Sequence, residues 1–304
     1  MNPTSSRPGA LARAFHLISK TALLQVLVFA LTTEVARAGS ATWKPNPTSN
    51  DWNTAANWRP RTVPNAPNDT ATFATSSITN VMLSDEQTLV DSIVFSPGAS
   101  AFTLTVEGGV SNSTLALDGV GLVNNSGVEQ NFFTTQQYVT GLNFYNQATA
   151  GTQTVYTAAE TSGIAFYDQT TAGSATFLIK GNDYFEDAWS ELLFYDNSTA
   201  SNGVFIITGA SGEDAEGAET YFYDNSSAGN GTFTNTPATD RYGYWGGTTN
   251  FHDNSTAGDS VFTNEGGAGT EGIGGLTQFW ENSTAANATI TCTAPRGLAV
   301  SLAR

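Results

Sequence analysis

Histidine, cysteine and basic residues are scarce in this chain of 304 residues. Of its two histidines only His252 lies after residue 38, so a chain shortened there could build no multi-histidine metal site within one molecule, and a single cysteine, Cys292, leaves no disulfide framework. Only 11 Lys and Arg residues stand against 27 Asp and Glu, which gives a net charge of −16. Because so acidic a surface repels nucleic acid and anionic lipid, neither is an expected partner.

The chain also lacks an apolar run long enough to span a membrane. Its longest, Thr21–Leu31, follows several basic residues and precedes the small-residue site Ala36-Arg37-Ala38. That order is typical of a secretory signal peptide, whereas a spanning helix needs about 20 apolar residues. We therefore expect residues 1–38 to be a signal peptide. The mature chain is expected to be exported and to have no transmembrane span.

A phrase of about a dozen residues dominates the rest of the chain, where residues 134–292 carry six copies of it. The copies begin at Phe144, Phe166, Phe194, Phe222, Phe251 and Phe279. Six residues after each Phe comes an Ala, and eleven residues after it comes Val155, Phe177, Phe205, Phe233, Phe262 or Ile290. The flanking residues alternate as strands do, and the corner between them is rich in Asn, Asp, Ser, Thr and Gly.

This repeat predicts an all-β fold, a right-handed parallel β-helix in which each copy is one coil. Units that cannot bury their apolar faces alone gain a core by stacking, with Phe on Phe and Ala on Ala. A propeller blade needs about 40 residues, which is more than the spacing between successive copies, so a propeller is not expected. A β-roll of the RTX type is a closer rival, but its nonapeptide is absent.

The segment before the repeats reads differently. Residues 39–133 contain Trp43, Trp52 and Trp58, followed by short strand-like runs separated by turns. We expect an N-terminal β-rich cap and the first coils. The tryptophans could form a sugar-binding platform, but plugging the open apolar end of the solenoid is favoured. Residues 293–304 are expected to form an irregular or truncated tail.

Together these motifs resemble a known group of exported proteins. The opening W…W…NW…VPNAPNDTATF, followed by F-x-[DN]-N-[ST]-[ST]-A-G repeats, is similar to the repeat-bearing proteins related to autotransporter passenger domains of Gram-negative bacteria. The resemblance covers nearly all of residues 40–292. It implies a β-helical stalk or surface protein, extracellular or associated with the outer membrane, and it implies no particular activity.

A column of acidic residues follows the repeated Phe by two positions: Asp168, Asp196, Asp224, Asp253 and Glu281, with Asn146 in the first copy. Calcium could bridge successive carboxylates, since it prefers oxygen ligands. Alternatively, each side chain hydrogen-bonds the backbone of its own corner, which Asn would do equally well. The second interpretation is favoured, so no cofactor is expected and calcium is the one ion considered.

Aromatic residues supply the candidate ligand contacts. An outward column of Tyr145, Tyr167, Tyr195, Tyr223, His252 and Trp280 could stack on sugar rings, but bracing the sheet is favoured. The stretches between copies hold more individual clusters, and loops on a rigid scaffold often carry recognition. The tentative ligand-binding residues there are Tyr184, Trp189, Tyr242, Tyr244 and Trp245.

No catalytic residues stand out. The repeats supply only two basic residues, Lys180 and Arg241, and their regular carboxylate columns define no unique cleft. We therefore expect an exported structural or adhesin-like protein without catalytic activity, whose partners are glycans or surface proteins. The alternative is a carbohydrate-binding or polysaccharide-degrading β-helix, an idea that rests on fold analogy.

Overall fold

The computed structural model describes residues 39–84, 87–107, 113–135, 140–183, 190–212, 215–239, 245–267 and 273–294. The expected signal peptide and residues 295–304 lie outside this part of the chain. Within it, strands dominate, and the one helical element is the short 3-10 turn η1 (Ala55–Asn57). No helix among the described residues is long and apolar enough to cross a membrane.

Twenty strands form two sheets. The first sheet contains β1 (Ala41–Trp43), β2 (Trp58–Arg59), β3 (Ala66–Phe73), β5 (Gln87–Phe95), β7 (Thr114–Asn124), β9 (Thr140–Phe144), β11 (Gly163–Phe166), β13 (Glu191–Phe194), β15 (Glu219–Phe222), β17 (Thr248–Phe251) and β19 (Leu276–Phe279). The second contains β4 (Asn80–Leu83), β6 (Thr103–Glu107), β8 (Gln130–Thr135), β10 (Thr152–Ala158), β12 (Ser174–Ile179), β14 (Val204–Ile207), β16 (Thr232–Asn235), β18 (Val261–Asn264) and β20 (Thr289–Cys292).

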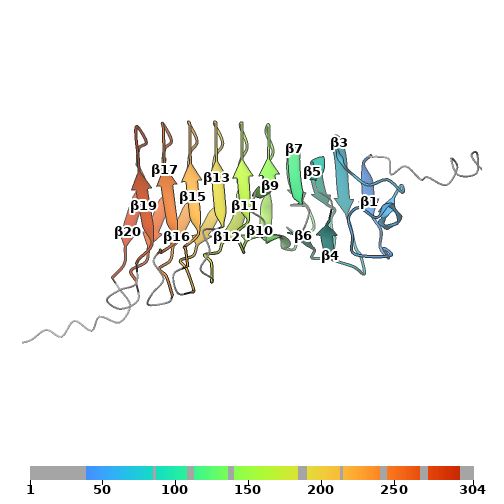
Figure 1. Cartoon of the computed structure of the whole chain (residues 1–304). Helices are drawn as coiled ribbons and strands as arrows, with labels where there is room; N and C mark the ends of the chain where they lie inside the picture. Colours follow the sequence, from blue (N-terminus) through green and yellow to red (C-terminus); the bar gives the residue numbers. More distant parts are fainter. Residues whose placement is uncertain are drawn as a thin grey trace, which may run out of the picture. The chain divides into compact units, whose positions relative to one another are not determined.

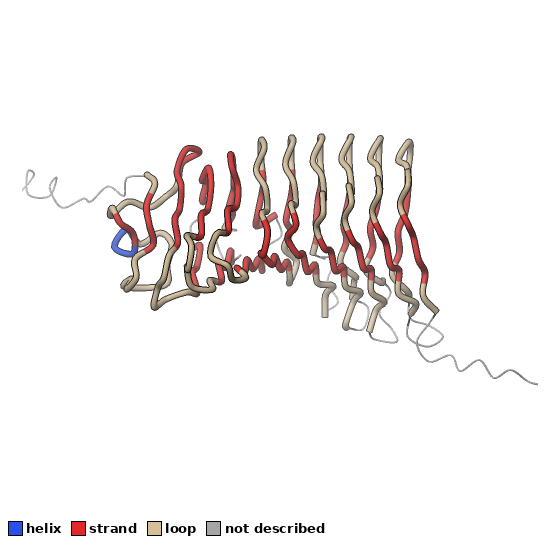
Figure 2. Tube along the Cα trace, turned by 180° about the vertical axis from the view of Figure 1, so that it is seen from behind, coloured by secondary structure: helices blue, strands red, loops and turns tan. Residues whose placement is uncertain are grey.

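The strands are those of a parallel β-solenoid, as the repeat predicts. From β3 onward each coil adds one strand to each sheet, and every pairing except β1 with β2 is parallel. Figures 1 and 2 show the coils side by side in chain order, with their narrow turns aligned at one edge. Single-residue bridges such as Thr171 to Thr199 connect these turns and give the coil a short third side.

Ladders of identical side chains fill the interior. The rings of Phe166 and Phe194 stack with centroids 4.8 Å apart and planes 6° from parallel. The Ala column beside them, for example Ala172 and Ala200, is fully buried from Ala150 to Ala257. Stacked rings at the coil spacing bury apolar area in every coil, so the repeated Phe and Ala are core residues, as predicted.

The first copy departs from the predicted column. Tyr156, rather than Val155, stands in register with Phe177, and their rings stack 4.9 Å apart. The register shifts between Thr152 and Val155, where Gln153 has a φ of 51°. This bulge adds one residue to β10, so the prediction that Val155 faces the core was wrong.

The tryptophans form the expected plug. Trp43, Trp52 and Trp58 are at most 1% exposed, and the Trp58 ring meets those of Trp43, Trp52 and Phe73 edge to face. The indole nitrogen of Trp58 donates to the carbonyl oxygen of Trp52 at 2.6 Å. Because their faces are buried, they cannot serve as a sugar platform, and this alternative was wrong.

Candidate functional site

The acidic column links successive coils. The backbone N–H of Asp168 donates to Oδ2 of Asp196 at 3.0 Å, and that of Asp196 donates to Oδ2 of Asp224 at 3.0 Å. The same bond recurs from Asn146 to Asp168 and from Asp224 to Asp253. Each carboxylate therefore binds the corner of the preceding coil, so the prediction that it binds its own corner was wrong.

The backbone explains why these positions are acidic or Asn. Asp168, Asp196, Asp224, Asp253 and Glu281 all have φ between 51° and 56°, and Asn146 has 58°. Asn and Asp tolerate this left-handed region better than most residues. Each acidic residue of the column thus makes the turn and accepts a bond from the preceding coil, whereas the Asn146 amide donates to Asp118 of the coil before it.

Calcium binding at this column stays a prediction. The bond to the preceding coil occupies one oxygen of each carboxylate, which gives the column a structural role without an ion. Among the residues with described positions, no three His, Cys, Asp or Glu side chains are grouped as a metal site would require. The donor set does not fit a dedicated calcium site, which usually takes six to eight oxygens.

The outward aromatic column forms a continuous stack. The rings of Tyr145, Tyr167 and Tyr195 lie 4.8 and 5.2 Å apart and within 10° of parallel. The stack continues through Tyr223 and His252 to Trp280. Ring faces in the middle of the stack are covered by their neighbours, so most of the column braces the sheet.

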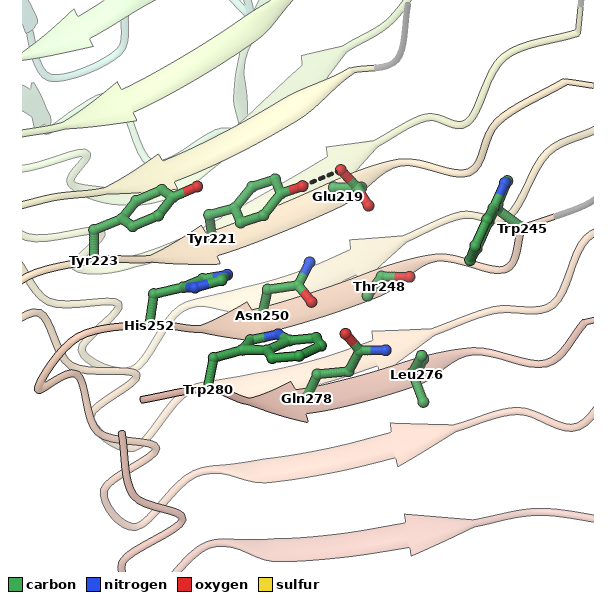
Figure 3. A pocket seen from close by; sticks show the side chains of 10 residues that line it. All are labelled: Glu219, Tyr221, Tyr223, Trp245, Thr248, Asn250, His252, Leu276, Gln278 and Trp280. Carbon is green, nitrogen blue, oxygen red and sulfur yellow. Dashed lines mark hydrogen bonds between the residues drawn. The ribbon is translucent and has the colours of Figure 1, made fainter. Parts of the chain in front are cut away.

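One place on this face is hollow. Short side chains of β17, Thr248 and Asn250, form a floor between the longer side chains of β15 and β19 (Figure 3). Tyr221 stands on one side, and Gln278 and Trp280 stand on the other. This depression, which we call the aromatic slot, has a volume of about 310 Å³ and is also lined by Glu219, Tyr223, Trp245, His252 and Leu276.

Trp245 closes one end of the slot. Its side chain is 52% exposed, and it also lines an adjoining hollow of about 240 Å³ with Glu216 and Glu219. Trp280, at the other end, is 48% exposed. Two large aromatic surfaces therefore remain open to solvent beside carboxylates, which is an uncommon use of tryptophan outside binding surfaces.

Burial shapes the protonation chemistry of the slot. The Tyr221 hydroxyl donates a hydrogen bond to Oε2 of Glu219. Desolvation raises the pKa of Glu219, with nearby Glu191 and Glu216 adding to the rise and the Tyr221 bond opposing it. Desolvation, and then the bond to Glu219, raises the pKa of Tyr221 far above 10. The hydroxyl is thus a permanent donor at neutral pH.

Of the five ligand-binding residues predicted from the sequence, only Trp245 can be placed. It lies in the slot, and Tyr184, Trp189, Tyr242 and Tyr244 lie outside the described residues. Sequence reasoning missed Tyr221, Asn250 and Gln278, which occupy one register column. The available signal was the change in this column from Ala165 and Leu193 to polar and aromatic residues in the later coils.

Comparison with known proteins adds no assignment. No model of a known protein family matches the chain, and neither a curated protein nor a solved structure is significantly similar to it. The site itself therefore carries the functional argument.

Proposed function

We propose that this protein is an exported, non-catalytic β-solenoid of the cell surface or extracellular space that binds glycans through the aromatic slot. The observation that carries the proposal is the pair of exposed indoles, Trp245 and Trp280, which line one hollow together with the polar side chains over β17. Sugar rings present apolar faces to aromatic side chains and hydroxyl groups to amides and carboxylates. The slot offers both kinds of partner.

The dimensions of the slot suit a single ring. Strands β15 and β19 are two strand spacings apart, which is about 10 Å. Carbon atoms in contact are about 3.5–4.0 Å apart, so a ring held between the side chains of β15 and those of β19 needs roughly 7–8 Å. Asn250 and Thr248 form the floor below it, and the volume of the slot falls near the lower end for small-ligand sites.

Charge restricts the class of glycan. Glu219 lines the slot, Glu216 lines the adjoining hollow, and the chain has a net charge of −16. Uronic acids and sulfated sugars would be repelled, because no Lys or Arg is among the described residues that line the slot. Neutral sugars and amino sugars are therefore the expected ligands, with amino sugars favoured by the carboxylates.

Binding without cleavage follows from the state of the carboxylates. A glycosidase of the usual kind places two carboxyl groups on either side of the bond to be cleaved. Here Glu219 is occupied by the Tyr221 hydroxyl, and Glu216 belongs to the same end of the slot. The arrangement offers hydrogen-bond acceptors for a ligand rather than an acid–base pair around it.

A glycan array probed with the secreted protein, paired with a reducing-sugar release assay, tests the proposal. We expect binding to oligosaccharides of neutral or amino sugars and no release of reducing ends. Trp280→Ala should lose the binding, whereas Tyr167→Ala, which removes a ring from the same stack four coils earlier, should keep it. Silence on the array, or cleavage of a bound glycan, would contradict the proposal.

A further inference from the structure

The second sheet presents an outer face that carries no charge. Along β10 to β20 the residues that point away from the core fall into two columns, which include Val155, Leu178, Val204, Ile206, Thr234 and Val261. All the residues in these two columns are Thr, Val, Ile or Leu. We call these two columns the uncharged face.

Acidic side chains stand on the other sides of the coil. The outer side of the first sheet carries Glu191 and Glu219 among mostly uncharged residues, and the aligned turns carry the Asp column. Near the uncharged face, charged residues flank the strand ends, among them Lys180 after β12, and Asp259 and Glu265 on either side of β18. In a chain with a net charge of −16, a surface without charge is the side on which two copies repel each other least.

The face also has apolar surface to bury. Val204 is 41% exposed and Val261 is 43% exposed, and they lie in one column with Thr232 between them. Exposed β-branched residues are common on sheets, so composition alone does not identify an interaction surface. A contiguous patch of this kind on an otherwise acidic molecule is typical of an interaction surface.

From these observations we propose that the uncharged face is the interface of a homodimer, in which a second copy of this chain packs its own uncharged face against it. A two-fold axis brings the same two columns of each copy together. Six strands at about 4.8 Å and four residues at about 3.3 Å give an area of roughly 380 Å² per copy. Summed over both copies, this area still lies below the size of a standard interface, so the dimer is weak and depends on concentration.

Salt distinguishes this interface from one built on ion pairs. Screening weakens the repulsion between two acidic copies and leaves apolar contacts in place. Association should therefore strengthen as sodium chloride rises from low ionic strength to about 0.5 M, where the screening length has fallen well below 10 Å. An ion-paired interface would respond in the opposite direction.

Sedimentation velocity of the secreted protein over a range of concentrations and salt provides the test. Val204→Lys should weaken dimerisation at least tenfold, because a buried, unpaired charge is costly. Asn197→Lys adds the same charge to the same coil at the exposed turn and serves as the matched control, with circular dichroism to verify folding. A mass that stays monomeric, association that weakens with salt, or equal effects of both variants would overturn the proposal.

Discussion

A residue of the acidic column meets two demands at once. Asp196 holds the backbone in the left-handed region, with a φ of 56°, and its carboxylate accepts the N–H of Asp168 from the preceding coil. Without that acceptor, the N–H of the turn would lose its protein partner. The repeated Asp is therefore explained by backbone geometry and hydrogen bonding between coils.

Asp196→Ala should lower the free energy of unfolding by about 1–3 kcal/mol. The lost hydrogen bond accounts for about 0.5–1.5 kcal/mol of this, and left-handed backbone at a residue other than Gly or Asn accounts for the rest. Urea denaturation measures the loss. Asp196→Asn, which resembles the natural Asn146, should retain most of the stability. Equal losses in both variants would contradict the account.

The raised pKa of Glu219 makes the stability of the protein depend on pH. Desolvation raises its pKa above 4.5, so the folded protein holds this proton more tightly than the unfolded chain does. The resulting stabilisation is complete below about pH 4.5, the ordinary pKa, and is lost as pH rises through the raised pKa.

Glu219→Gln removes this titration and keeps an acceptor for the Tyr221 hydroxyl. The variant should therefore gain stability relative to the parent protein as pH rises from 4 to 7. Unfolding free energies measured across that range provide the check. A difference between variant and parent that does not change with pH would show that Glu219 is not desolvated as described.

Among the strands, those with strict repetition or alternation were predictable. The runs Val81–Leu83 and Phe102–Val106 correspond to β4 and β6, and the repeated Phe ends the later strands of the first sheet. The bulge in β10 was not predictable, because one extra residue before Tyr156 leaves the alternation looking intact. The third side of the coil was missed because it consists of single bridges within the turns.

The slot was less predictable than the fold. Its residues come from β15, β17 and β19, about 28 residues apart in sequence, and only the register brings them together. Trp245 attracted attention because it lies in a variable stretch. Asn250 and Gln278 look like ordinary surface positions until the strands are aligned.

Gly121, which lies within β7, is a position where neighbouring coils pack closely. It has a φ of 85°, and an added Cβ would lie 2.4 Å from the backbone nitrogen and oxygen of Thr149 in the next coil. Gly121→Ala should therefore destabilise the protein by more than backbone strain alone, which is about 1–2 kcal/mol. Thermal unfolding measures the difference.

Gly127→Ala is the matched control for this variant. Gly127 has a similar φ of 81°, but an added Cβ would have nothing within 4 Å. It should show the cost of strain without the clash. If the two variants melt at the same temperature, the coils are not packed as tightly at this corner as the structure indicates.

Along the described coils of the solenoid, stability is expected to depend on contacts between neighbouring coils. Each coil contacts the coils beside it, and the tryptophan plug covers the first one. In such a linear array, loss of the plug should loosen the adjacent coils first.

Trp58→Ala tests this behaviour. Removing the buried indole should cost about 3–5 kcal/mol. Hydrogen exchange should accelerate most in β1, β3 and β5 and least in the distant β17 and β19. Uniform acceleration along the solenoid would mean that it unfolds as one unit, contrary to the nearest-neighbour description.

The acidic surface, the repeated core and the aromatic slot define the proposed role of the molecule. The regular columns build a rigid support, and the slot departs from them where three coils present different side chains in one column. Recognition is therefore assigned to one group of strands near the C-terminal end of the described coils rather than to the repeated phrase.

Isothermal titration with an amino-sugar oligosaccharide is the most direct test of that assignment. The parent protein should bind one oligosaccharide per slot, and Tyr221→Ala and Trp280→Ala should each weaken binding about tenfold or more, since an aromatic contact and its lost burial exceed 1.4 kcal/mol. Tyr167→Ala should bind as the parent does. Unchanged binding in both slot variants, or equal loss in all three, would contradict the account.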